Sequence, residues 1–293
     1  MWLVLAGASA VCFGFRGILY QWSSRKPLDR NLMLFGVYLS GTILTLTANL
    51  WAGQAWTPGM LTGLLMGAFS YLANTAMYKG FAVGKASMVA VFTGLPPIVV
   101  VLLAYVLWGE KLNGGQAAAF VLVLCGILFL RYSKELSFSD LKGLHWAVLA
   151  MIGFGVTDLS SKQSVLWNGQ VLPTLTLMFG TGALLFLISW WQPWRSKRKE
   201  KELRNKEPHA ERWSNGRTVL WGLAVGLTNC CGMILQLPAF KLTAAGLVSA
   251  VLATNILIIL LFSRFYLKER FNRYERIGIA LAIAGIVLLR LLQ

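Results

Sequence analysis

The chain has 293 residues, of which 57% are hydrophobic and 13% charged, and its mean hydropathy is +0.63. A soluble protein needs a polar surface that this composition cannot supply, so the chain is expected to be a multi-pass protein of the cell (plasma) membrane, with the lipid bilayer as a partner. The net charge of +16 is also typical of nucleic-acid binding. Here, however, the basic residues lie between apolar runs, which favours membrane topology and argues against nucleic acid.

Ten apolar segments are long enough to cross ~30 Å of hydrocarbon at ~1.5 Å per residue. All are expected to be helices, because lipid leaves backbone groups unsatisfied in other open structures and because the runs do not alternate like barrel strands. In chain order the segments are 2–21, 31–53, 60–78, 86–108, 114–131, 142–161, 171–191, 218–238, 244–267 and 273–291. One long connection, the basic segment 195–217, is expected to be hydrophilic.

The chain contains an internal repeat. A shift of 159 residues aligns the turn WGEKLN at 108–113 with LKERFN at 267–272, and a shift of 141 residues fits the segments upstream. The two shifts pair glycines with glycines: Gly63 with Gly222, Gly67 with Gly226, Gly126 with Gly285, Gly14 with Gly155 and Gly41 with Gly182. The sequence therefore predicts an all-α membrane protein of two five-helix repeats, 1–131 and 142–291. Because each repeat has an odd number of spans, the two are expected to be inverted.

Charge between the segments predicts the orientation. Twenty-one basic residues lie on the face that carries the loops after odd-numbered segments, against four on the other face: Lys111, Lys162, Lys241 and Arg290. The positive-inside rule places the rich face, with loop 195–217, in the cytoplasm and both chain ends outside.

The C-terminal part of each half resembles the EamA-type transporters of the drug/metabolite transporter superfamily. The first copy reads KGFAVGKASMVAVFTGLPPIVVVLLAYVLWGEKLNGGQAAAFVLVLCGILFL, and the second reads AFKLTAAGLVSAVLATNILIILLFSRFYLKERFNRYERIGIALAIAGIVLLR. SAVCFGFRG in the first segment is similar to the first helix of the family. The resemblance implies ten helices around a central path and transport of small organic metabolites or drugs by alternating access. Members of the family are usually drawn with both ends in the cytoplasm, which conflicts with the charge count.

Within WGEKLN, the acid Glu110 is expected to serve structure. A carboxylate beside a base and Asn113 can bind backbone groups and start the following helix. A direct role of Glu110 in coupling or substrate contact is the alternative.

Ionisable residues inside a span are costly and are therefore candidates for function. Arg16 and Asp158 stand out, and the inverted halves are expected to place them on either side of the midplane, about 15 Å apart along the normal and too far for an ion pair. They fit the two ends of a zwitterionic solute, or Asp158 could titrate in a proton cycle. Alternatively, Arg16 reaches towards its nearer interface and Asp158 bonds to neighbouring hydroxyls.

Neutral polar residues supply further candidate contacts to substrate. They lie in the third, eighth and ninth segments: Tyr71, Asn74, Tyr78, Asn229, Gln236 and Asn255. Residues spaced by four share a helix face, as Asn74 and Tyr78 do, which suits a cavity wall and equally suits hydrogen bonding between helices. Pro96 and Pro97 are expected to disturb the fourth segment near its middle.

We therefore expect a secondary transporter of a small organic molecule, with a proton or sodium ion as the candidate coupling ion. A membrane-embedded enzyme or a non-transporting scaffold is the alternative. The sequence shows no hydrolase or metalloprotease motif and no second buried carboxylate to pair with Asp158, so no enzyme activity, metal or cofactor is predicted. The solute, the direction of transport and a homodimeric state stay open.

Overall fold

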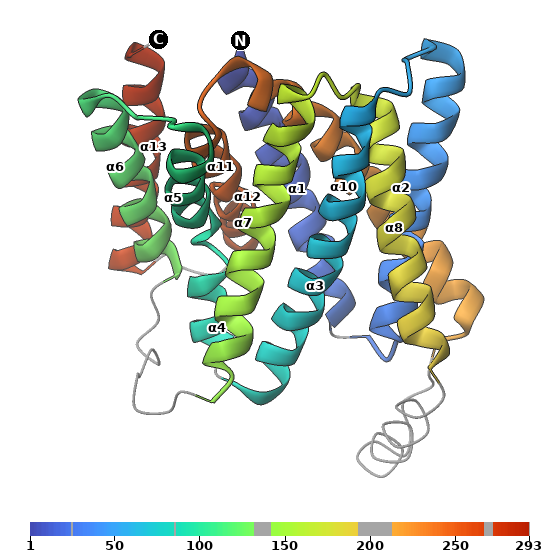
Figure 1. Cartoon of the computed structure of the whole chain (residues 1–293). Helices are drawn as coiled ribbons and strands as arrows, with labels where there is room; N and C mark the ends of the chain where they lie inside the picture. Colours follow the sequence, from blue (N-terminus) through green and yellow to red (C-terminus); the bar gives the residue numbers. More distant parts are fainter. Residues whose placement is uncertain (25, 85, 132–141, 193–212, 267–271, 293) are drawn as a thin grey trace.

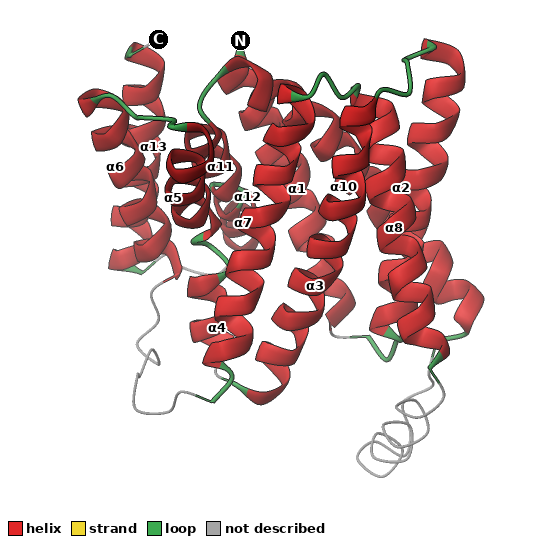
Figure 2. Cartoon of the chain, in the orientation of Figure 1, coloured by secondary structure: helices red, strands yellow, loops and turns green. Residues whose placement is uncertain are grey.

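The protein forms a bundle of long helices that run roughly parallel to one another (Figure 1). This computed structural model describes residues 1–24, 26–84, 86–131, 142–192, 213–266 and 272–292. Over these residues the secondary structure is helical, with connecting loops and turns and without strands (Figure 2). Both chain ends lie at the same end of the bundle, which we call the termini end. Most of the basic segment 195–217 and the second copy of the turn, with Glu269 and Arg270, lie outside the described residues.

The helix bounds follow the predicted segments closely. In the first half they are α1 (Trp2–Ser24), α2 (Arg30–Ala52), α3 (Thr62–Val83), α4 (Ala86–Phe92), α5 (Pro96–Trp108) and α6 (Gly114–Arg131), with a short 3-10 turn η1 (Pro58–Leu61) before α3. In the second half they are α7 (Leu144–Leu166), α8 (Val171–Trp191), α10 (Asn215–Leu242), α11 (Ala245–Ala253), α12 (Ile256–Phe265) and α13 (Arg273–Leu291).

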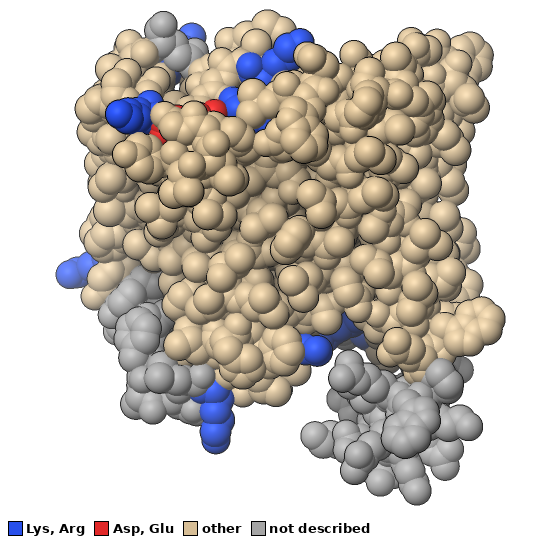
Figure 3. Space-filling model, viewed as in Figure 1, with Lys and Arg blue, Asp and Glu red and all other residues tan. Residues whose placement is uncertain are grey.

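Eight stretches of the described chain are long and apolar enough to cross a membrane, counting α4 with α5 and α11 with α12 as one stretch each. The other two predicted segments correspond to α3 and α13, which do not reach the same combination of length and apolar character. On the face shown in Figure 3, the described charged side chains lie towards the two ends, and the band between them carries none. The fold is thus that of a multi-pass membrane protein.

Two of the segments are interrupted near their middle. The break between α4 and α5 was predicted from Pro96 and Pro97, which start α5. At this break the guanidinium of Arg131 donates to one carbonyl oxygen, that of Ala90, and to the hydroxyl of Thr93. The break between α11 and α12, at Thr254 and Asn255, was not predicted, since no proline marks it.

Close helix packing depends on glycines at equivalent places. A Cβ on Gly63 would collide with the carbonyl oxygen of Thr174 in α8, and one on Gly222 would collide with that of Met33 in α2. Met33 and Thr174 are themselves 141 residues apart. The same exchange of partners recurs in four more glycine pairs: Gly67/Gly226 against Met178/Val37, Gly126/Gly285 against Ala282/Val123, Gly14/Gly155 against Ile258/Val99, and Gly41/Gly182 against Phe179/Tyr38. Both shifts found in the sequence therefore also relate residues that touch in space.

Candidate functional site

Asp158 lies in α7 and accepts hydrogen bonds from two other helices. The side-chain amide of Gln236 in α10 donates to Oδ1 at 3.0 Å, and the hydroxyl of Ser249 in α11 donates to Oδ2 at 2.6 Å. Gln236 and Ser249 are each 2% exposed, whereas Asp158 as a residue is half-buried. The carboxylate is thus held in one orientation by buried partners.

Arg16 in α1 is also anchored on α10. Its guanidinium donates to the side-chain oxygen of Asn229, which is 3% exposed, and lies 4.4 Å from the ring centroid of Phe13. The ring of Tyr20 lies 5.9 Å away on the same helix. Arg16 is therefore fixed inside the bundle by an amide and two aromatic rings, and the alternative that it reaches towards an interface does not describe it.

One face of α10 connects the two charged groups. Asn229 and Gln236 are seven residues apart, which is two helical turns, so they share a face with a rise of about 10 Å between them. Arg16 and Asp158 make no hydrogen bond or ion pair with each other, although Arg16 is near enough to act on the carboxylate through its charge. A solute of matching length could bridge them.

The polar residues of α3 join helices to one another. The hydroxyl of Tyr71 shares a hydrogen bond of 2.6 Å with Ser189 in α8. The amide of Asn74 donates to the carbonyl oxygen of Ser70 at 2.8 Å and to the hydroxyl of Tyr38 in α2 at 3.4 Å. The structure thus uses Tyr71 and Asn74 for contacts within and between helices. It does not bring them to Asp158.

The other two candidates, Tyr78 and Asn255, are not hydrogen-bonded to either charged group, although Tyr78 lies near enough to Arg16 for that charge to act on it. Arg30 at the start of α2 lies over the ring of Tyr78, 5.1 Å from its centroid. Asn255 lies at the break between α11 and α12, where its backbone N–H donates to the carbonyl of Leu252. Neither contact joins them to Arg16 or Asp158.

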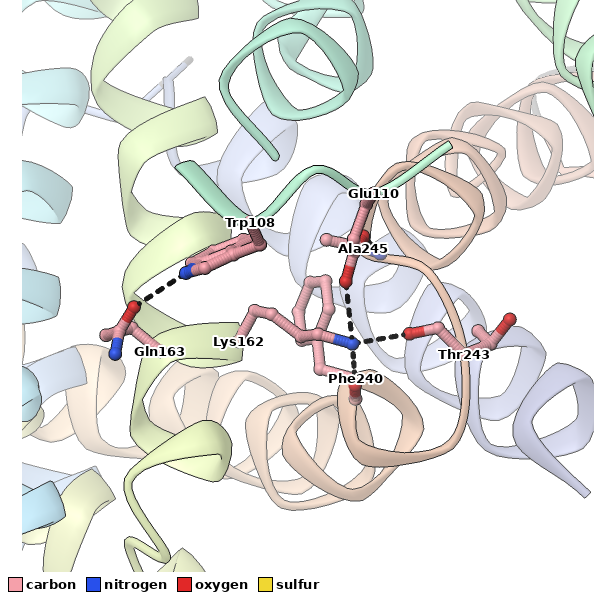
Figure 4. Close-up of polar contacts among 7 residues, drawn as sticks. All are labelled: Trp108, Glu110, Lys162, Gln163, Phe240, Thr243 and Ala245. Carbon is pink, nitrogen blue, oxygen red and sulfur yellow. Dashed lines mark hydrogen bonds and ion pairs between the residues drawn. The ribbon is translucent and has the colours of Figure 1, made fainter. Parts of the chain in front are cut away.

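A second charged cluster, at the termini end, was missed (Figure 4). The ammonium group of Lys162 in α7 lies 3.0 Å from Oε1 of Glu110 and donates to the carbonyl oxygens of Phe240 and Thr243 at 2.9 and 2.8 Å. The other carboxylate oxygen of Glu110 accepts the backbone N–H of Ala245 at 2.8 Å. We call these five residues the latch cluster.

The latch cluster corrects two expectations. Lys162 was expected to be an interfacial base between two segments. Instead it belongs to α7, and its side chain is only 9% exposed. Glu110 binds a backbone group as expected, but that group is the N–H of Ala245 at the start of α11 in the other half. The following helix, α6, is started by Asn113 alone, whose side chain accepts the N–H of Gln116. The available signal was that Lys162 lies four residues after Asp158, on the same helix face.

A surface hollow of about 360 Å³ lies apart from both charged clusters. It is lined by Trp22, Trp213, Arg217, Leu220 and Trp221. None of the predicted site residues lines it, so it does not explain the polar interior.

Comparison with known proteins identifies the family of this chain. The family model described as the EamA-like transporter family matches residues 1–132 and again 141–291. The chain belongs to the EamA-like transporter family. One solved crystal structure is similar to this EamA-like chain with a TM-score of 0.73 and 16% identity, over 99% of this chain and 96% of the other, which shows the shared fold alone. No curated protein shows a significant match.

Membership in this family confirms the predicted resemblance and the class of protein. EamA-like proteins are membrane proteins that typically act as transporters and are not an enzyme family. A small molecule is therefore the expected substrate of this chain. The chemistry of that molecule has to be argued from the residues of the interior.

Proposed function

We propose that this EamA-like protein is a secondary carrier of a small organic solute and works by alternating access. In this proposal, α3 and α13 span the membrane with the eight more apolar stretches, giving ten spans in two inverted halves, 1–131 and 142–291. The five glycine pairs support it. In each pair, the two glycines are equivalent in the two halves, and the two residues that they lie against are also equivalent to each other. Such exchange is expected from a pseudo-two-fold axis in the membrane plane.

The observation that carries the proposal is the pair of charged groups on one face of α10. Arg16 and Asp158 are anchored by nearly fully buried amides, and both are half-buried as residues. Charged groups inside a membrane span are costly, so they indicate a ligand or ion site. We propose that Arg16 binds the anionic end and Asp158 the cationic end of a zwitterionic solute.

Around these two groups, the remaining predicted residues have two roles. Asn229 and Gln236 hold the charged groups, together with Ser249, which was not predicted, and Tyr71, Asn74, Tyr78 and Asn255 shape the surrounding path. All the residues come from one chain, so the site does not require a homodimer. A proton carried by Asp158 is the favoured coupling ion, with sodium as the alternative.

For orientation we retain the positive-inside argument. The end with 21 basic residues, including those of loop 195–217, faces the cytoplasm, and the protein belongs to the plasma membrane with both chain ends outside. Protease cleavage of that loop from the outside of intact cells would reverse this assignment.

The test is transport by the purified chain in proteoliposomes. Amino acids, sugars, nucleobases and cationic drugs are first ranked by thermal shift, because a bound ligand stabilises by mass action. The best ligand is then assayed for saturable counterflow. Counterflow that is strongly reduced in Asp158→Asn and Arg16→Gln, and kept in Lys111→Gln at an exposed site, supports the proposal. Ligand turnover without solute movement indicates an enzyme.

A further inference from the structure

We propose that Lys162 and Glu110 form a gate that closes the termini end of the transport path and must break whenever that end opens. This inference rests on the proposed alternating access. It assigns to the latch cluster the control of access to the site around Asp158, which lies one helical turn below Lys162 in α7.

The first argument is connectivity. Glu110 belongs to the turn between α5 and α6 in the first half, whereas Lys162 and the residues at the α10–α11 junction belong to the second half. A second hydrogen bond joins the two halves at the same place: the indole N–H of Trp108 at the end of α5 donates to the side-chain oxygen of Gln163 at 3.0 Å. Figure 4 shows these groups converging on one small region. Opening that end by moving one half against the other requires these bonds to part.

The second argument is that the charges are fully engaged. A buried ion pair stabilises a state only when further hydrogen bonds complete its geometry. Lys162 uses three donors on Glu110, Phe240 and Thr243, and Glu110 uses both oxygens. The ammonium group lies at the C-terminal end of α10 and the carboxylate at the N-terminal end of α11, so both helix dipoles favour the arrangement.

The third argument is that the described residues of the opposite end do not repeat the arrangement around Lys162, although the counterpart of Glu110, Glu269, lies outside them. The counterpart of Lys162, 141 residues earlier, is Gln21, which is uncharged and exposed. Phe240 is 0% exposed, but its counterpart Phe81, 159 residues earlier, is 41% exposed. Among the described residues, the ion pair between the halves is therefore at the termini end.

Helix packing has the same asymmetry. At the termini end, α5 packs on α11 and α7 packs on α10. Within the described ranges, the counterpart pairs α4 with α12 and α1 with α3 do not pack to a comparable extent. The structure thus has the arrangement expected of a carrier that is closed at one end, and the latch cluster lies at the closed end.

The experiment measures distances at both ends by double electron–electron resonance. Spin labels at the exposed positions Lys111→Cys and Lys241→Cys report the termini end, and labels at Ala82→Cys and Arg273→Cys report the opposite end. The background replaces the four native cysteines and is used only after it shows wild-type counterflow. Each pair is measured in the parent and in the gate variants.

The informative variants are Lys162→Met, Lys162→Arg and the double variant Lys162→Met with Glu110→Gln. The double variant removes the pair without leaving a buried charge unpaired, so it separates gating from misfolding. The double variant should shift the termini end from the short label–label distance (closed) to the long one (open). We expect the open-to-closed ratio to rise by at least about tenfold, because the variant loses a contact that only the closed state makes. The opposite end should close in step, and Lys162→Arg should restore the parent distances.

Each outcome of the distance measurement either supports or overturns the gate. Unchanged distances in the double variant, beside normal counterflow in the parent, overturn the gate and leave the carrier intact. Broadening at both ends together also overturns it, since that is the mark of a purely structural pair. Absence of counterflow in the parent removes the proposed function, and the gate with it.

Discussion

The carboxylate of Asp158 accepts a 2.6 Å hydrogen bond from the hydroxyl of Ser249, a residue 91 positions away in the chain. With Gln236 holding the other oxygen, α7 is tied to α10 and α11 at the level of the proposed substrate. Ser249→Ala frees one oxygen and keeps the charge. We expect a KM several-fold higher with kcat little changed, measured by counterflow. A loss of kcat alone would mean that Ser249 does not position the carboxylate for binding.

Replacing Asp158 by asparagine should change how transport depends on pH. The ionised carboxylate binds the cationic end of the solute, so wild-type affinity should fall as the pH is lowered through the titration of Asp158. The asparagine side chain keeps the shape and cannot titrate, so uptake by the variant should be weak and nearly independent of pH. Arg16 is the other charged group that acts on this carboxylate. Matching pH–rate profiles in wild type and variant would remove Asp158 from coupling and binding.

Arg16→Lys tests whether charge or shape matters at the other end of the site. Lysine keeps the charge but loses the planar fork that can hold Asn229 and a carboxylate together. We expect a loss of about 1.4–2.8 kcal/mol in binding, which is roughly 10- to 100-fold in Kd. Isothermal titration with the best thermal-shift ligand measures it, and equal affinities for the two side chains would contradict bidentate recognition.

Glycine packing can be tested with matched substitutions. Gly63→Ala places a methyl group against the carbonyl oxygen of Thr174, a backbone atom that cannot move away easily. We expect a loss of about 1–3 kcal/mol of stability from overpacking, seen as a lower Tm. Gly7→Ala in α1 is the control, because nothing lies within 4 Å of its Cβ. A similar loss in both variants would show that close approach at Gly63 is not the cause.

The buried pair predicts a specific non-additivity. Glu110→Gln leaves the ammonium group of Lys162 without its counter-charge and should cost about 3–5 kcal/mol of unfolding free energy. The double variant with Lys162→Met should recover part of that loss. Thermal unfolding of both singles and the double gives the coupling energy. Simple addition of the two single effects would mean that the side chains do not interact.

Much of the helical framework could be predicted from the sequence, because a long, non-alternating apolar run in lipid can satisfy its backbone hydrogen bonds only as a helix. The glycine matches also proved informative, since Gly63 and Gly222 have to meet equivalent backbone atoms for the helices to approach closely. In the candidate site, Asp158, Gln236, Arg16 and Asn229 were all singled out as polar residues in apolar runs. Their pairing was not predicted.

What could not be predicted follows from contacts between distant segments. Lys162 lies near the end of an apolar run, where a base is normally interfacial, and only the junction after α10 makes it a buried partner. The break at Asn255 has no proline to signal it. Glu110 has a plausible role beside its own helix, and no local pattern indicates that it caps α11. In each case the deciding neighbour is distant in the chain or carries no sequence mark.

Pro238 lies inside α10, between Gln236, which holds the carboxylate of Asp158, and Phe240, whose carbonyl holds Lys162. Having no N–H, it leaves the carbonyl of Ile234 without its usual intrahelical partner. The backbone hydrogen-bond ladder of α10 is therefore one bond short between the residue that holds Asp158 and the residue that holds Lys162. A single helix serves both charged clusters, and it is weakest in the stretch between them.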